Sequence, residues 1–222
     1  MPKQTFFNLP QSKRDRLTEA AIAEFAEFHF HDASINRIIA KANVSRGSFY
    51  QYFEDLEDLY MYIFQIVAEQ KQAYIDKHFQ IKPQGDIFTV LHSMYRAGLQ
   101  FAKEHPAYAK IGNHLMKGDQ NFKYKVIGEW EEYTKEYMMR LLKQGQEAGF
   151  VRKDIDMEVA AFLFYQQSLT LTDHYLMESD WFENPDRYMQ VIQEMLKIFS
   201  QGIGTKQSIG IEKVNEEEGD TR

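Results

Sequence analysis

The segment between Ser34 and Phe53 holds the side chains whose types and spacing could do chemistry. Arginine can form two hydrogen bonds to guanine and glutamine can do the same to adenine, so Arg46 and Gln51 are suited to reading base edges. Between them, Gly47 has no side chain and would let a backbone come close to a partner. This pattern indicates hydrogen bonding to DNA rather than catalysis.

The other polar residues of the segment could position the protein on phosphates. Hydroxyl groups, amides at helix ends and cationic side chains supply most such contacts. We therefore predict a DNA-binding set made of Ser34, Asn36, Arg37, Lys41, Ser45, Arg46, Gly47, Ser48, Tyr50, Gln51 and Tyr52.

Two short helices with a tight turn between them would present these side chains. Ser34 stands at the N-cap position of the first helix, 35–42, and Ser45 at that of the second, 46–53. Asn43 occupies the turn, where a left-handed backbone is expected and asparagine tolerates it. The inner faces would take Ile35, Ile38, Ile39, Ala42, Phe49 and Phe53. The segment is predicted to be a helix-turn-helix whose second helix enters the major groove.

The rest of the chain reads as helical, because its apolar residues recur at spacings of three and four and alternating runs typical of strands are absent. We predict an all-α fold of about nine helices, at about 11–28, 35–42, 46–53, 55–79, 86–103, 106–118, 119–148, 156–177 and 185–202. Three parts are expected: a DNA-binding domain at 1–53, a helical effector-binding and dimerisation domain at 54–204, and a disordered tail at 205–222.

The stretch from about Arg14 to Leu59 resembles the N-terminal domain of TetR-family transcriptional regulators. The matching motifs are Ala21-Ile-Ala-Glu-Phe25, Ala33-Ser34, Ile39-Ala-Lys-Ala-Asn-Val-Ser45 and Tyr50-Gln-Tyr-Phe53. The resemblance implies a homodimer whose two heads read a palindromic DNA operator. It further implies a helical body with an effector pocket, and a repressor that a small molecule releases from DNA.

The sequence departs from the family pattern at three positions. His29 and Asn43 stand where the family usually has glycine, and both residue types can enter the left-handed region. Leu56 replaces a lysine that commonly touches phosphate. We expect phosphate binding to rely instead on Lys41, Tyr52, Lys3, Lys13 or Arg14.

Charge and composition limit the kinds of site and the cellular location that the protein can have. The chain of 222 residues carries a net charge of −7, yet residues 1–52 hold seven Lys or Arg against five acids, so the +2 head precedes a −9 remainder. The absence of cysteine excludes disulfides, zinc–thiolate sites and cysteine nucleophiles. Residues 1–10 are too polar for a signal peptide, and no apolar stretch reaches membrane length, so we expect a cytoplasmic protein.

Three clusters of histidines or acids could suggest a metal site: His29-Phe-His31, Asp55-Leu-Glu-Asp58 and Asp154-Ile-Asp-Met-Glu158. The histidine pair lacks a third ligand, and the last cluster lacks the glycine and the longer ligand series of a calcium loop. Acids before a helix usually cap it. We expect no metal, no cofactor and no catalytic residues, because no nucleophile–base pair is present. An all-α enzyme is the least favoured alternative.

The second half of the chain is rich in aromatic residues and methionine. Those that join apolar bulk to a polar group are candidates for binding a small hydrophobic or amphipathic effector: Tyr95, His114, Trp130, Tyr165 and Gln166. Those on the last two helices could form a four-helix dimer interface: Phe162, Leu169, Met189, Ile192, Met195 and Phe199. The alternative is a DNA-binding protein whose body binds a protein partner instead of a small ligand.

Overall fold

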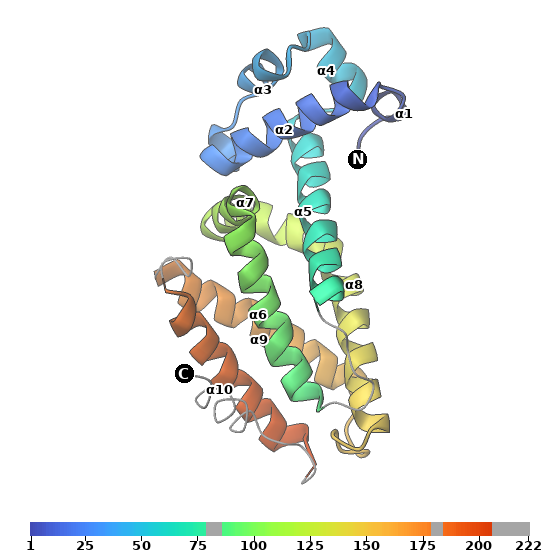
Figure 1. Cartoon of the computed structure of the whole chain (residues 1–222), viewed down its shortest axis with the longest axis vertical. Helices are drawn as coiled ribbons and strands as arrows, with labels where there is room; N and C mark the ends of the chain where they lie inside the picture. The colour runs from blue at the N-terminus through green and yellow to red at the C-terminus, as the bar shows by residue number, and fades with distance from the viewer. Residues whose placement is uncertain (79–85, 179–183, 206–222) are drawn as a thin grey trace. The chain divides into compact units, whose positions relative to one another are not determined.

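The all-α fold is confirmed in the computed structural model, which describes residues 1–78, 86–178 and 184–205 (Figure 1). These residues form ten α-helices and one 3₁₀ turn, with no strand among them. None of the described helices has the length and apolar character needed to cross a membrane. The predicted disordered tail, apart from Thr205, lies outside the described residues.

The observed helices follow the predicted ones to within one or two residues at each end. One helix was missed: α1, Gln4–Phe7, precedes the first predicted helix. The others are α2 Gln11–Glu27, α3 Ile35–Ala42, α4 Arg46–Tyr52, α5 Leu56–His78, α6 Ile87–Glu104, α7 Pro106–Lys117, α8 Gln120–Glu147, α9 Met157–Glu178 and α10 Pro185–Ile203, with the 3₁₀ turn η1 at Phe30–Asp32.

The chain forms two compact units. We call residues 1–74 and 101–126 the head unit, and residues 75–100 together with those from 127 onward the body unit. The head unit contains the helix-turn-helix and also α7. The predicted domain limits at residues 53 and 204 stay predictions.

Within the head unit, α2 packs against both α3 and α7. Its apolar stripe, which includes Leu17 and Phe25, is almost completely buried. Aromatic pairs join further elements of this unit: Phe25 of α2 meets Tyr60 of α5 edge-on at 4.8 Å, and Phe30 of η1 stacks on Phe122 of α8 at 3.9 Å between ring centroids. Such pairs add to the stabilisation that burial of apolar surface provides.

A buried carboxylate fixes the beginning of α3 to α2. The Oε1 atom of Glu24, a residue only 7% exposed, accepts hydrogen bonds from the Ser34 backbone N–H at 2.7 Å and from Arg37 Nε at 2.8 Å. Ser34 occupies the predicted N-cap position, but its own hydroxyl makes no capping bond. Glu24 therefore does the capping from a neighbouring helix, where its negative charge also suits the helix dipole.

The body unit has its own apolar core, formed by α6, α8, α9 and α10. Its most buried members include Phe88, Leu142, Phe164 and Leu196. Close packing between α8 and the start of α6 depends on Gly145, because a Cβ there would lie 2.9 Å from Cβ and Cγ2 of Ile87. Helix α8 then ends before Gly149, whose φ of 87° is the left-handed conformation common after helix C-termini.

Replacing Glu24 should destabilise the head unit. Glu24→Ala leaves the Ser34 amide without its acceptor and should lower the free energy of unfolding by about 1–3 kcal/mol. Glu24→Gln keeps an oxygen at the same place and should lose less. Urea unfolding followed by circular dichroism measures both, with the exposed Glu27→Ala on the same helix as control. Equal stability of Glu24→Ala and Glu27→Ala would contradict this role.

The close approach at Gly145 gives a second stability prediction. Gly145→Ala should lower the free energy of unfolding by about 1–3 kcal/mol, because the new methyl meets Ile87 Cβ, which is attached to the backbone and cannot rotate away. Gly128→Ala on the same helix has nothing within 4 Å and is the matched control. That control should be stabilised by up to about 1 kcal/mol through helix propensity. Thermal unfolding that ranks Gly145→Ala level with Gly128→Ala would refute the packing argument.

Candidate nucleic-acid interface

The predicted helix-turn-helix is present as α3 and α4, which lie beside α2 (Figure 1). Asn43 adopts φ 53° and ψ 54°, and it is the only non-glycine residue with positive φ among the described residues. The left-handed turn expected there is confirmed. His29 differs from Asn43, since its φ of −59° is accessible to any residue and needs no glycine.

Helix α4 is fixed at its N-terminus and along its inner face. The Ser45 hydroxyl oxygen accepts a hydrogen bond from the Ser48 backbone N–H at 3.1 Å, which is the capping bond expected from the sequence. Phe49 and Phe53 are completely buried, as the spacing predicts. These contacts determine which side of α4 faces outward.

The outward side of α4 carries Arg46, Gly47 and Gln51, all exposed, which we call the reading edge. The guanidinium of Arg46 donates from Nη1 to Asn36 Oδ1 at 2.8 Å and lies 5.9 Å from the centre of the Tyr50 ring. Arg46 is therefore held by a side chain from α3. Gly47 has nothing within 4 Å of the position a Cβ would take, so space for close backbone approach is present.

The residues predicted to contact phosphate lie in different environments. Lys41 and Tyr50 are exposed, whereas Ser34 and Ser48 are half-buried. Arg37 is exposed but engaged: it pairs with Glu24, donates to the Asp32 carbonyl at 2.6 Å and stacks on Phe28 at 4.0 Å from the ring centre. The hydrogen bond between Arg37 and Glu24 raises the pKa of Arg37.

Tyr52 is not on the exposed side of α4, contrary to expectation. Only 5% of it is exposed, because its ring lies against Phe6, with 6.3 Å between centroids. Its hydroxyl still accepts a hydrogen bond from Lys13 Nζ at 3.2 Å. The expectation failed because Phe6 belongs to α1, the helix that the sequence pattern did not reveal.

Three of the basic residues expected to replace the missing lysine at Leu56, namely Lys3, Lys13 and Arg14, make contacts within the protein. Lys3 Nζ donates to the Tyr50 carbonyl and pairs with Glu54, at 3.0 Å in each case. Arg14 donates to the Phe7 carbonyl at 2.5 Å. Lys3 donates to a backbone carbonyl of α4, whereas Lys13 donates to a side chain of that helix.

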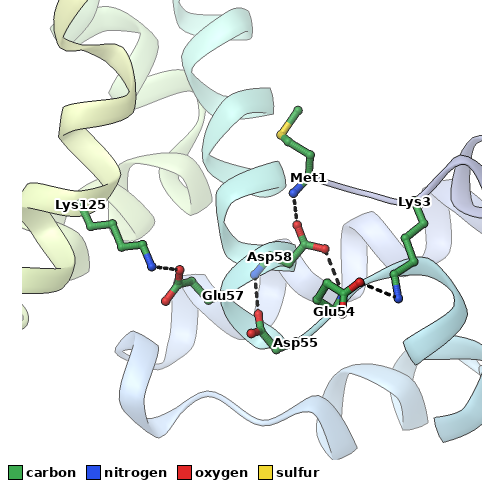
Figure 2. Close-up of polar contacts among 7 residues, drawn as sticks. All are labelled: Met1, Lys3, Glu54, Asp55, Glu57, Asp58 and Lys125. Carbon is green, nitrogen blue, oxygen red and sulfur yellow. Dashed lines mark hydrogen bonds and ion pairs between the residues drawn. The ribbon is translucent and has the colours of Figure 1, made fainter.

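The turn after α4 is built on acidic side chains, as Figure 2 shows. Asp55 Oδ1 accepts from the Asp58 backbone N–H at 2.8 Å, and Asp58 Oδ2 accepts from the Glu54 N–H at 3.0 Å. Nearby ion pairs join Glu57 to Lys125 and Asp58 to the Met1 ammonium (Figure 2). The capping interpretation of the Asp55–Asp58 cluster is thus confirmed.

A metal site finds no support in the described part of the chain, where no three side chains of the ligating types gather. The His29 ring instead lies against that of His114, tilted by 32° with 4.3 Å between ring centroids. Asp156 Oδ1 accepts from the backbone N–H groups of Glu158 and Val159 at 2.9 and 3.1 Å. The acids before α9 therefore cap it, as the sequence indicated.

The effector candidates fall in both units. His114 belongs to the head unit, where its Nδ1 lies 3.1 Å from the Phe25 carbonyl oxygen. The other four belong to the body unit, in which Tyr165 is buried and Trp130 and Gln166 are half-buried. The Tyr95 hydroxyl is hydrogen-bonded to Ser168 Oγ at 2.7 Å, and burial raises the pKa of Tyr95 to about 12. Tyr95 is therefore neutral at physiological pH.

The dimer candidates divide into core and surface residues. Ile192 and Met195 are 1% and 5% exposed and belong to the core of the body unit. Phe162 is 46% exposed, and Leu169, Met189 and Phe199 are half-buried. An open groove of about 670 Å³ runs between α9 and α10, lined by Leu163, Gln167, Leu171, Arg187, Gln190, Val191, Gln193, Glu194, Met195, Ile198 and Phe199. The sequence did not predict this groove.

Comparison with known proteins agrees with this geometry. Residues 17–63 match the family of bacterial regulatory proteins of the tetR type. A probable acrEF/envCD operon repressor of Escherichia coli strain K12 is 24% identical over 190 residues, which cover 84% of this chain and 86% of that protein.

Solved structures extend the likeness of fold to most of the chain. A TetR family transcriptional regulator from Chloroflexus aurantiacus has a TM-score of 0.58 and 29% identity, with 93% of this chain and 100% of that one covered. SmeT, the repressor of the Stenotrophomonas maltophilia multidrug efflux pump SmeDEF, has a TM-score of 0.67 at 17% identity, covering 88% and 92%. The helix-turn-helix domain of this chain therefore belongs to the family of bacterial regulatory proteins of the tetR type, and its helical body has the fold of solved TetR-family regulators.

Proposed function

We propose that the protein is a homodimeric repressor that binds a palindromic DNA operator through α4 and leaves it when a small apolar or amphipathic molecule binds the body. The reading edge carries this proposal: Arg46 is exposed and held by Asn36, and Gln51 is exposed on the same helix. A guanidinium held in place loses less conformational entropy when it pairs with guanine. The exposed members of the remaining set, such as Lys41 and Tyr50, would position α4 on phosphates.

A second copy of this chain is the proposed occupant of the groove between α9 and α10. Apolar side chains stand exposed on both helices, among them Phe162, Leu163 and Ile198, and burying them would stabilise an association. The groove lining also holds a cation, Arg187, and a carboxylate, Glu194. In a two-fold interface the same patch meets itself, so opposite charges within it can pair between copies.

An effector would bind inside the body unit, where a few polar groups sit within an apolar core. The hydrogen-bonded pair of Tyr95 and Ser168 is the best-defined of these. Both are neutral, so they suit an uncharged polar group on a mainly apolar molecule. Such a ligand would act by favouring one of two spacings between the heads, only one of which matches half-sites about 34–36 Å apart.

Changing the reading edge should remove sequence preference. Operator DNA is first enriched from a random-sequence library by the wild-type protein, and binding is then measured by mobility shift. Arg46→Ala and Gln51→Ala should each weaken specific binding by about tenfold or more, the effect of one lost bidentate base contact. The mutant proteins should keep the thermal stability of the wild type, since both positions are exposed.

Arg46→Lys is the matched control for charge. It keeps the cation, and with it the electrostatic attraction to phosphate, but loses the fork that reads guanine. We expect non-specific binding and its salt dependence to stay unchanged while preference for the enriched sequence falls. Unaltered preference in Arg46→Lys, Arg46→Ala and Gln51→Ala would contradict the assignment of α4 as the DNA-reading helix.

Placing a charge on the groove face should dissociate the dimer. Leu163→Glu and Ile198→Glu would each place a carboxylate among the apolar side chains of the groove, so sedimentation should give the mass of a single chain for both. Tyr133→Glu, at an exposed aromatic of α8, is the control and should stay dimeric. A wild-type protein that sediments as a monomer would overturn the proposal, as would dimers of unchanged affinity in both groove variants.

A further inference from the structure

Helix α4 has only seven residues and leaves its last carbonyl groups without partners of its own. Phe53, which follows it, is extended at φ −131° and ψ 150°, so no left-handed residue closes the end. The Phe53 N–H reaches the Phe49 carbonyl, but the next amide, that of Glu54, donates to Asp58 instead. Tyr50, Gln51 and Tyr52 therefore need donors from elsewhere.

Residues 3–5 supply all three donors. Lys3 Nζ donates to the Tyr50 carbonyl at 3.0 Å, and the Lys3 backbone N–H donates to the Tyr52 carbonyl at 2.8 Å. The Thr5 hydroxyl donates to the carbonyl of Gln51, between these two. Three consecutive carbonyls at the end of α4 are thus capped by a segment more than forty residues earlier in the chain.

Phe6 anchors this segment in the head unit. Its side chain is completely buried, with ring centroids 5.0 Å from Phe53 and 5.2 Å from Tyr62. Short hydrogen-bonded turns close α1 on either side, from Phe6 N–H to Lys3 carbonyl and from Asn8 N–H to Gln4 carbonyl. The capping donors are therefore held by a packed ring.

The positive charge of Lys3 interacts with groups of the protein itself. Its ammonium lies at the C-terminal end of α4, where a cation is favoured by the helix dipole, and it also pairs with Glu54 at 3.0 Å (Figure 2). The side chain is only 38% exposed. This arrangement differs from that of a lysine extended toward solvent to meet a phosphate.

We propose that residues 3–6, the capping segment, are positioning residues for DNA recognition: they close the C-terminal end of α4 and hold the reading edge in its binding conformation without touching DNA. The inference rests on the proposed role of α4 in reading DNA. If the end of α4 frays, only a fraction of molecules is ready to bind, and the observed Kd rises by the inverse of that fraction.

Thr5 gives the sharpest test, since valine matches its shape and serine matches its hydroxyl. With the enriched operator DNA as probe, Thr5→Val should raise Kd about fivefold, the effect of one lost hydrogen bond. Thr5→Ser should bind like the wild type. Gln4→Ala, whose side chain reaches only Asn8 at 3.4 Å, is the matched control and should also bind like the wild type.

Lys3 separates capping from phosphate contact. Lys3→Met should raise Kd at every salt concentration and leave the slope of log Kd against log salt unchanged. A lysine that neutralises a phosphate would instead lower that slope by about 0.9. A lowered slope in Lys3→Met would overturn the capping role of this residue.

The remaining outcomes separate this inference from the proposed function. Wild-type affinity in Thr5→Val, or affinity as weak in Thr5→Ser as in Thr5→Val, would overturn the capping proposal while α4 could still read DNA. Failure of the proposed function would appear differently, as unchanged sequence preference in Arg46→Ala and Gln51→Ala. Circular dichroism should show equal helix content in Thr5→Val and Thr5→Ser. A difference in binding between the two variants is then due to the hydroxyl.

Discussion

A helix of seven residues cannot stay folded in water by itself, and the DNA-reading function proposed for this protein depends on such a helix. The structure holds α4 from three directions. Ser45 caps its N-terminus, Phe49 and Phe53 bury its inner face, and residues 3–5 close its C-terminus. Each contact also determines where Arg46 and Gln51 point. The same contacts therefore stabilise the helix and orient its reading edge.

Helix α3 is likewise held by a residue from another helix. Its first turn is closed by Glu24 from α2, and the arginine that pairs with this carboxylate, Arg37, lies on α3 itself. Asn36, on the neighbouring position of that turn, then holds Arg46 of α4. Two adjacent residues of α3 therefore make separate polar contacts, one to the buried Glu24 of α2 and one to the side chain proposed to read guanine. A buried carboxylate with two hydrogen bonds and an ion pair is costly to disrupt, which favours a single orientation of α3.

Features that depend on residues close together in the chain were predicted correctly from the sequence. The Ser45 cap, the left-handed turn at Asn43 and the apolar spacing of α3 and α4 are local signals, and all three were found. What the sequence missed depends on residues far apart in the chain. Helix α1 is too short to show periodicity, and its one buried residue, Phe6, finds its partners more than forty positions later. The burial of Tyr52 escaped prediction for the same reason, whereas the capping by Glu24 did so because the acceptor lies on another helix, ten residues before Ser34.

We expect α4 to be ordered already in the free protein, with its reading edge in place before DNA arrives. Amide hydrogen exchange over residues 46–53, measured with and without the enriched operator DNA, tests this most directly. We expect the α4 amides of the free protein to be protected to a similar degree as those around Phe25, with little further protection on DNA. Exchange as fast as in an open loop, slowing only when DNA binds, would contradict it.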